Sequence, residues 1–146
     1  MTIAVTGATG YLGRFVVERL VAEGMAVRAW RRESSDLSGL PGGIDWIDGS
    51  LNATHSAAAL VDGADMLVHS ALDHTPGRYR GGEGGDLAGY LRTNVGESLA
   101  LLATARAAGI RRCVVLSSRA VFGALQGAGF IPDGAPACPD THYGAA

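Results

Sequence analysis

The chain has 146 residues, a formal net charge of −2 at pH 7 and 47% hydrophobic residues. This length suits one ordinary domain with a real core. The nearly neutral charge gives no electrostatic support for binding nucleic acid or a membrane surface. No apolar run approaches a membrane span and the amino terminus has no signal-peptide pattern, so we expect a cytoplasmic protein. Cys113 and Cys138 have no metal-binding or redox spacing.

A strand–turn–helix–strand unit opens the chain, with strands predicted over residues 2–6 and 25–30 and a helix over 11–23. The turn carries three glycines at equal spacing, Gly7, Gly10 and Gly13. In such a unit the first glycine allows a tight turn, the second lets the backbone approach a pyrophosphate, and the third lets the helix pack on the strand. The unit predicts dinucleotide binding. The alternative is a glycine-rich turn in another α/β domain.

The end of the second predicted strand indicates which dinucleotide is bound. The residue there meets the adenosine ribose, and a carboxylate selects NAD. This chain has Trp30, Arg31 and Arg32 at that point, and guanidinium groups suit a 2′-phosphate. We therefore expect NADP in preference to NAD. A solvated turn is the alternative for the arginine pair, and the acidic Glu33 lies close to the pair and works against NADP.

The remaining elements continue the alternation of strands and helices. Strands are predicted over residues 44–48, 65–71 and 112–117, and helices over 54–62 and 90–108. The strands are apolar throughout, as in sheets covered on both faces, so Cys113 is expected to be a small core residue. This pattern predicts an α/β fold with a doubly wound parallel sheet, a Rossmann fold of strand order 3-2-1-4-5. The last helix is expected to face the sheet through Leu91, Val95, Leu99, Leu102 and Ala103.

Two long segments rich in glycine and proline interrupt the pattern, at residues 73–89 and 123–142. Both follow the carboxyl ends of predicted strands, where ligands bind in open α/β sheets. The first segment is a candidate cover for a ligand, with an ordinary surface excursion as the equal alternative.

Five segments together resemble the extended short-chain dehydrogenase/reductases, in their NAD(P)-dependent epimerase/dehydratase branch. They are residues 6–13 (TGATGYLG), 46–51 (WIDGSL), 67–72 (LVHSAL), 92–96 (RTNVG) and 109–123 (GIRRCVVLSSRAVFG). The resemblance covers nearly the whole chain and implies the amino-terminal Rossmann portion of such an enzyme.

The resemblance, with the arginine argument, implies a site for NADP, or for NAD, at the matched positions. Its residues are Gly7, Thr9, Gly10, Tyr11, Leu12, Gly13, Arg31, Arg32, Ser50, Leu51, Ser70, Ala71, Leu72, Asn94 and Tyr143. Ser50 replaces the family's adenine-binding Asp, which leaves Leu51 as the apolar partner. Asn94 is expected to stabilise the helix and the loop below the active site.

The implied chemistry is reversible hydride transfer at a hydroxyl/carbonyl substrate, with a nucleotide sugar as one candidate. Ser118 matches the hydroxyl that holds the substrate oxygen. Tyr143 matches the proton-transferring Tyr of the family's Y-x-x-x-K motif. A phenol has an unperturbed pKa of ~10 and a nearby ammonium lowers it. The family's Lys would follow Ala146, and the sequence contains no Lys.

We therefore expect residues 1–146 to be a Rossmann domain that belongs to a longer enzyme. A non-catalytic NADP-binding or redox-sensing module is the alternative. The expected partners are a small-molecule substrate and, through the helix at 90–108, a second copy of the chain. Ser117 is expected to be a buried strand-end group and His69 a satisfied core histidine.

Overall fold

The computed structural model describes residues 1–75, 83–123 and 129–146. The predicted loops at 73–89 and 123–142 each lie partly outside the described residues, so the covering role of the first stays a prediction. The chain divides into two compact units. The first comprises Met1–Leu72 with Gly96–Leu116, and the second comprises Asp73–Val95 with Ser117–Ala146.

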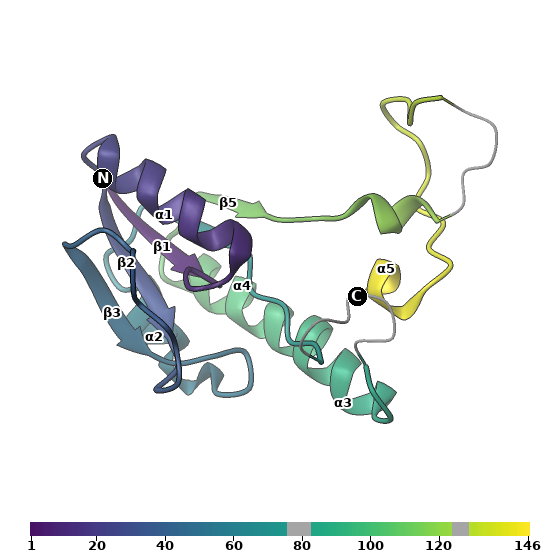
Figure 1. The fold of residues 1–146 in the computed structure, drawn as a ribbon, viewed down its shortest axis with the longest axis horizontal. Helices are drawn as coiled ribbons and strands as arrows, with labels where there is room; N and C mark the ends of the chain where they lie inside the picture. The colour runs from purple at the N-terminus through teal and green to yellow at the C-terminus, as the bar shows by residue number, and fades with distance from the viewer. Residues whose placement is uncertain (76–82, 124–128) are drawn as a thin grey trace. The chain divides into compact units, whose positions relative to one another are not determined.

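A five-stranded parallel sheet forms the centre of the first unit, in the order β3-β2-β1-β4-β5 (Figure 1). Its strands are β1 (Thr2–Thr6), β2 (Ala26–Arg31), β3 (Ile44–Asp48), β4 (Met66–His69) and β5 (Arg112–Val115). The predicted order 3-2-1-4-5 is therefore confirmed. β4 ends before residue 71 because the Ser70 hydroxyl turns back to the Thr6 carbonyl, at 2.7 Å.

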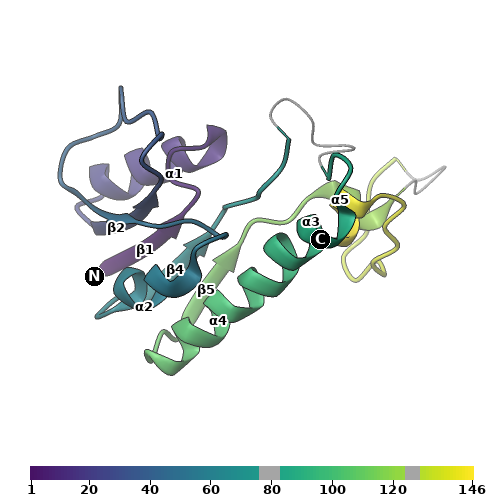
Figure 2. The ribbon, with the colours of Figure 1, turned by 90° about the horizontal axis from the view of Figure 1, so that it is seen from below.

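Helices cover both faces of this sheet, as a doubly wound fold requires. The helical segments of the first unit are α1 (Tyr11–Ala22), η1 (Thr54–Ser56), α2 (Ala57–Val61) and α4 (Ser98–Ala107). Alternate residues of β1 face opposite sides of the sheet. Ile3 packs in a cluster with Val17 of α1. Ala4 packs in the other cluster, with Leu60 of α2 and Leu101 of α4. Figure 2 shows α1 on one side of the sheet and α2 and α4 on the other.

The helix predicted over 90–108 has a different buried face from the expected one. Its backbone forms three stretches, α3 (Leu87–Leu91), the π-helical η2 (Arg92–Glu97) and α4. Leu91 and Leu99 of the predicted face are 36% and 61% exposed, whereas Leu101 and Ala105 are fully buried. The buried residues Asn94, Leu101 and Ala105 repeat at helical spacing, and Leu102 of the predicted face is partly buried against the core. The predicted apolar stripe is therefore wrong at Leu91 and Leu99, because apolar residues lie on more than one side of this helix.

β5 is the end strand of the sheet and is exposed along its length. Cys113 is exposed, and Val114 and Val115 are 45% and 50% exposed. The expectation that Cys113 is a core residue is therefore wrong. It rested on an apolar strand covered on both faces, and an end strand of this kind has no such cover in the first unit.

Short helical segments build the second unit together with α3 and η2. They are η3 (Arg119–Phe122) and α5 (His142–Ala145), which contact each other. The amide of Cys138 donates to the carbonyl of Val121 at 2.9 Å. Ser117 is exposed, so its predicted burial is wrong; the chain has left the ladder of β5 before that residue. Among the described residues, none of the helices has both the length and the apolarity needed to cross a bilayer.

Candidate cofactor-binding and catalytic residues

The glycine-rich turn between β1 and α1 leaves no room for side chains at two of its glycines. Gly7 has a φ of 71°, a left-handed conformation. A Cβ added there would lie 2.7 Å from the amide nitrogen of Ala71. A Cβ at Gly13 would overlap the carbonyl oxygen of Gly7. These clashes explain why the first and third positions of the motif are glycine.

The amino end of α1 is open toward a ligand. Gly10 is its N-cap, so no side chain caps the first turn. The first backbone N–H groups of a helix lack partners within the helix and attract anions. Tyr11 and Leu12, in that turn, are 77% and 56% exposed. A turn with glycine at its tightest positions, leading into a helix without a side-chain cap, fits the pyrophosphate of a dinucleotide.

A buried hydrogen-bond chain holds the end of β4 against this turn. The Thr6 hydroxyl lies 2.7 Å from Nδ1 of His69, whose Nε2 lies 2.9 Å from the Ser98 hydroxyl. The amide of Ala71 donates to the Thr6 hydroxyl at 3.3 Å. His69 is 5% exposed, and burial lowers its pKa. The prediction of a satisfied core histidine is confirmed, and its role is to fix the backbone that contacts Gly7.

The two arginines at the end of β2, Arg31 and Arg32, have different surroundings. Nε of Arg31 donates to the carboxylate of Asp48 at 3.0 Å, because the two residues face each other in the β2–β3 register. The Arg32 side chain is exposed, and its backbone amide donates to the Ser35 hydroxyl at 2.9 Å. The sequence argument missed Asp48. The signal was present, since Asp48 ends the strand that was predicted next after Arg31.

The segment predicted to meet the adenine packs closely on Trp30. A Cβ at Gly49 would lie 2.7 Å from Nε1 of the Trp30 indole. That indole nitrogen is buried without a hydrogen-bond partner among the described residues. Ser50 is half-buried and its carbonyl accepts from the amide of Ala53 at 3.0 Å. Leu51 is 5% exposed and belongs to the core cluster with Trp30.

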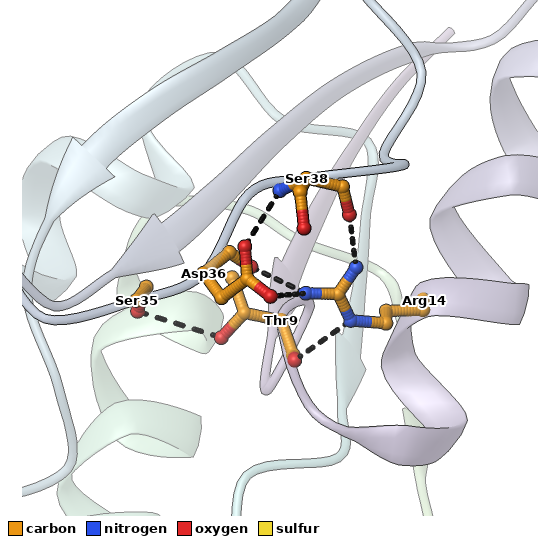
Figure 3. Close-up of polar contacts among 5 residues, drawn as sticks. All are labelled: Thr9, Arg14, Ser35, Asp36 and Ser38. Carbon is orange, nitrogen blue, oxygen red and sulfur yellow. Dashed lines mark hydrogen bonds and ion pairs between the residues drawn. The ribbon is translucent and has the colours of Figure 1, made fainter.

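Arg14, which the sequence argument did not single out, links the glycine-rich turn to the segment after β2. Its guanidinium donates to the carbonyls of Thr9, Asp36 and Ser38 (Figure 3). Ser35 lies beside them, with its hydroxyl 3.5 Å from that of Thr9. An Arg in the first turn of the helix, directly after the third glycine, was the available signal.

The two predicted catalytic residues belong to the second unit, on elements that contact each other. Ser118 is the N-cap of η3, and its hydroxyl oxygen accepts from the amide of Ala120 at 3.2 Å. Tyr143 is a half-buried residue of α5. Its neighbour Gly144 lies so close to the Ala120 carbonyl that a Cβ would overlap it. The Thr141 hydroxyl accepts from the Gly144 amide at 3.1 Å and caps α5.

Asn94 is engaged entirely with backbone groups of the second unit. Its amide oxygen accepts from the Asp73 amide at 2.7 Å. Its amide nitrogen donates to the carbonyls of Asp73 and Tyr90, at 2.8 and 3.1 Å. The stabilising role expected of Asn94 has this geometry as its support. Burial raises the pKa of Tyr90, and the carboxylate of Glu83 raises it further.

Comparison with known proteins places these features in a family. The sterol demethylase protein B of Methylococcus capsulatus is 37% identical over 136 residues, which are 92% of this chain and 38% of that protein. A short-chain dehydrogenase/reductase superfamily protein from Agrobacterium tumefaciens, solved with bound NAD, is 29% identical. It superposes with a TM-score of 0.77 over 99% of this chain and 41% of its own.

A second solved structure, MoeE5 in complex with UDP-glucose and NAD, is 29% identical. Its TM-score is 0.76, over 99% of this chain and 44% of its own. The chain thus spans less than half the length of each of these relatives. The model of the NAD dependent epimerase/dehydratase family matches residues 3–146. The chain, with its three-glycine turn and 3-2-1-4-5 sheet, therefore belongs to the NAD-dependent epimerase/dehydratase family.

Proposed function

We propose that residues 1–146 form the cofactor-binding domain of an oxidoreductase, epimerase or dehydratase that acts on a hydroxyl/carbonyl pair and prefers NADP. The observation that carries the proposal is the turn at Gly7 and Gly13, where neither residue has room for a Cβ. Ser118 and Tyr143, on the contacting elements η3 and α5, support the catalytic part.

The proposed chemistry divides the work between these two side chains. When bound, the nicotinamide supplies reversible hydride transfer. The Ser118 oxygen accepts from a backbone amide, which orients the hydroxyl and leaves its hydrogen for a substrate oxygen. Tyr143 holds or moves the proton at that same oxygen. Because a phenol has an unperturbed pKa of ~10, Tyr143 needs a cation beside it to act near neutral pH.

Substitution of the two side chains tests this assignment in the full-length protein. UDP-glucose, the ligand of MoeE5, is the first substrate to try, with its conversion to product as the signal, because only a net oxidation leaves the nicotinamide reduced. Tyr143→Phe and Ser118→Ala should each lower kcat by roughly 10²–10⁴-fold, the contribution of a positioned acid–base group. Ser117→Ala, at an exposed neighbouring hydroxyl, is the control and should keep wild-type turnover. Unchanged turnover in Tyr143→Phe removes that residue from the mechanism.

The NADP preference rests on the cations after β2. Arg31 forms an ion pair with Asp48, and the side chains of the two residues are 40% and 80% exposed. An exposed pair of this kind is worth about 0–1 kcal/mol, so a phosphate competes with it. Arg32 is exposed beside it. Titration with NADP and NAD should give tighter binding of NADP, by about tenfold or more for charge-assisted hydrogen bonds. Tighter binding of NAD would overturn the preference.

A second candidate function is a non-catalytic NADP-binding or redox-sensing module. Full-length protein that binds NADP but neither reduces nor oxidises substrates would support this candidate. We also propose a cytoplasmic location, in keeping with the unpaired thiols of Cys113 and Cys138.

We propose a homodimer that pairs through the outer face of α4. Leu99 is 61% exposed on this face. A shallow hollow lies along the same helix, lined by Leu102, Ala103, Arg106 and Ala107. Leu99→Glu should shift the sedimentation coefficient of the full-length protein toward that of a monomer. An unchanged coefficient would count against pairing at this face.

A further inference from the structure

Arg14 uses its whole guanidinium to join two separate segments of the first unit. Nε donates to the Thr9 carbonyl at 3.2 Å, inside the glycine-rich turn. Nη1 donates to the Ser38 carbonyl at 2.7 Å, and Nη2 donates to the Asp36 carbonyl. Figure 3 shows the three contacts converging on one planar group. Only an arginine has donors in this fork arrangement.

The segment at 35–38 is itself held in shape by further polar contacts. The Asp36 carboxylate accepts from the Ser38 amide at 2.9 Å and lies 3.8 Å from Nη2 of Arg14. Hydrogen bonds from Ser38, and then the charge of Arg14, lower the pKa of Asp36. The Ser35 hydroxyl accepts from the Arg32 amide at 2.9 Å. Arg32 is thereby connected to the segment that Arg14 holds.

These contacts surround the position where the adenosine ribose of a dinucleotide lies. In this fold the ribose lies between the glycine-rich turn and the residues at the end of β2, here Arg31 and Arg32. The donors of Arg14 are directed at carbonyl oxygens, so Arg14 acts on the backbone of its neighbours. Ordering a binding loop before the ligand arrives reduces the cost of binding.

We propose that Arg14 is a positioning residue that holds segment 35–38, and with it Arg32, in place to receive the 2′-phosphate of the cofactor. The proposal deepens the NADP preference and rests on it for the identity of the ligand. Loss of Arg14 should therefore weaken the binding of a 2′-phosphorylated adenosine more than it weakens the binding of the unphosphorylated counterpart.

Adenosine 2′,5′-bisphosphate and 5′-AMP are suitable probes, since they differ only in the 2′-phosphate. Calorimetric titration of the full-length protein gives a Kd for each. Arg14→Gln should raise the Kd of the bisphosphate about tenfold, the equivalent of ordering one or two side chains, and that of 5′-AMP much less. Arg14→Lys should fall between wild type and Arg14→Gln, because one ammonium cannot bridge three carbonyls. Arg19→Gln, on the same helix and in an exposed pair with Glu23, is the matched control.

The outcomes separate this proposal from the NADP preference. If Arg14→Gln changes the Kd of the bisphosphate and the Kd of 5′-AMP by the same factor, or changes neither, the proposed role of Arg14 is overturned. Wild-type protein that binds 5′-AMP as tightly as the bisphosphate overturns the NADP preference. The role of Arg14 is decided separately, by whether Arg14→Gln changes the ratio of the two Kd values from its wild-type value. Thermal unfolding checks that each variant is folded. Should Arg14→Gln not fold, Arg14→Lys carries the test, and an unchanged ratio in Arg14→Lys then counts against the proposal.

Discussion

Asn94 offers the sharpest test of how the second unit is held together. Its side chain is 5% exposed and makes three hydrogen bonds, to the Asp73 amide, the Asp73 carbonyl and the Tyr90 carbonyl. A net hydrogen bond contributes about 1 kcal/mol, so Asn94→Ala should cost about 3 kcal/mol if nothing replaces the three bonds. Asp73 is half-buried, and water reaching its backbone reduces the expected loss to about 2 kcal/mol.

Urea unfolding of the full-length protein, followed by circular dichroism, measures this loss. Asn94→Asp keeps the acceptor for the Asp73 amide but removes both donors, so it should also be destabilised. Asn52→Ala is the matched control, because Asn52 is exposed; surface changes of this kind stay within about 0.5 kcal/mol. A loss in Asn94→Ala no larger than that in Asn52→Ala would refute the structural role assigned to Asn94.

Three further predictions concern other parts of the chain. Gly13→Ala should abolish cofactor binding measured by titration, because its Cβ would overlap the Gly7 carbonyl and push α1 from the turn. Gly144→Ala should lower kcat, because its Cβ would overlap the Ala120 carbonyl and displace α5, which carries the proposed acid–base residue Tyr143. Stability should fall as pH drops below about 6.5, since burial lowers the pKa of folded His69 and the unfolded chain then binds the extra proton.

Each of these predictions has a control. Gly42→Ala serves both glycine variants, because a Cβ at Gly42 would meet nothing within 4 Å. Cofactor binding or turnover that matches Gly42→Ala would contradict the clash arguments. For His69, the urea midpoint at pH 7.5 should exceed that at pH 5.5, given the sign of the linkage. A midpoint that rises as the pH falls would contradict it.

The local features of this fold were predictable from the order of its residues. The glycines of the first turn are demanded by contacts between near neighbours: the Gly13 position meets Gly7, six residues away. Strand order followed from alternating elements and the fixed hand of their connections. Ser118 and Tyr143 lie on elements that contact each other, and their catalytic roles remain predictions.

Other features depended on which distant segments meet. Leu99 and Leu101 are both apolar and two residues apart, so they point to different sides of α4, and only the fold decides that Leu101 is buried and Leu99 exposed. Cys113 looked like a core residue because its neighbours are apolar, but β5 is exposed along its whole length. Local hydrophobicity cannot reveal the cover that a strand receives from elsewhere in the fold.

The sequence by itself therefore determined the Rossmann sheet, the glycine-rich turn and the pair of arginines at the end of β2, because these depend on residue type and short-range spacing. Only the tertiary structure decided which groups the arginine side chains contact. Arg31 is paired across strands with Asp48, and Arg14 is joined to Asp36 and Ser38. Such partners are 17 to 24 residues apart, and only the folding of the chain brings them within hydrogen-bond distance.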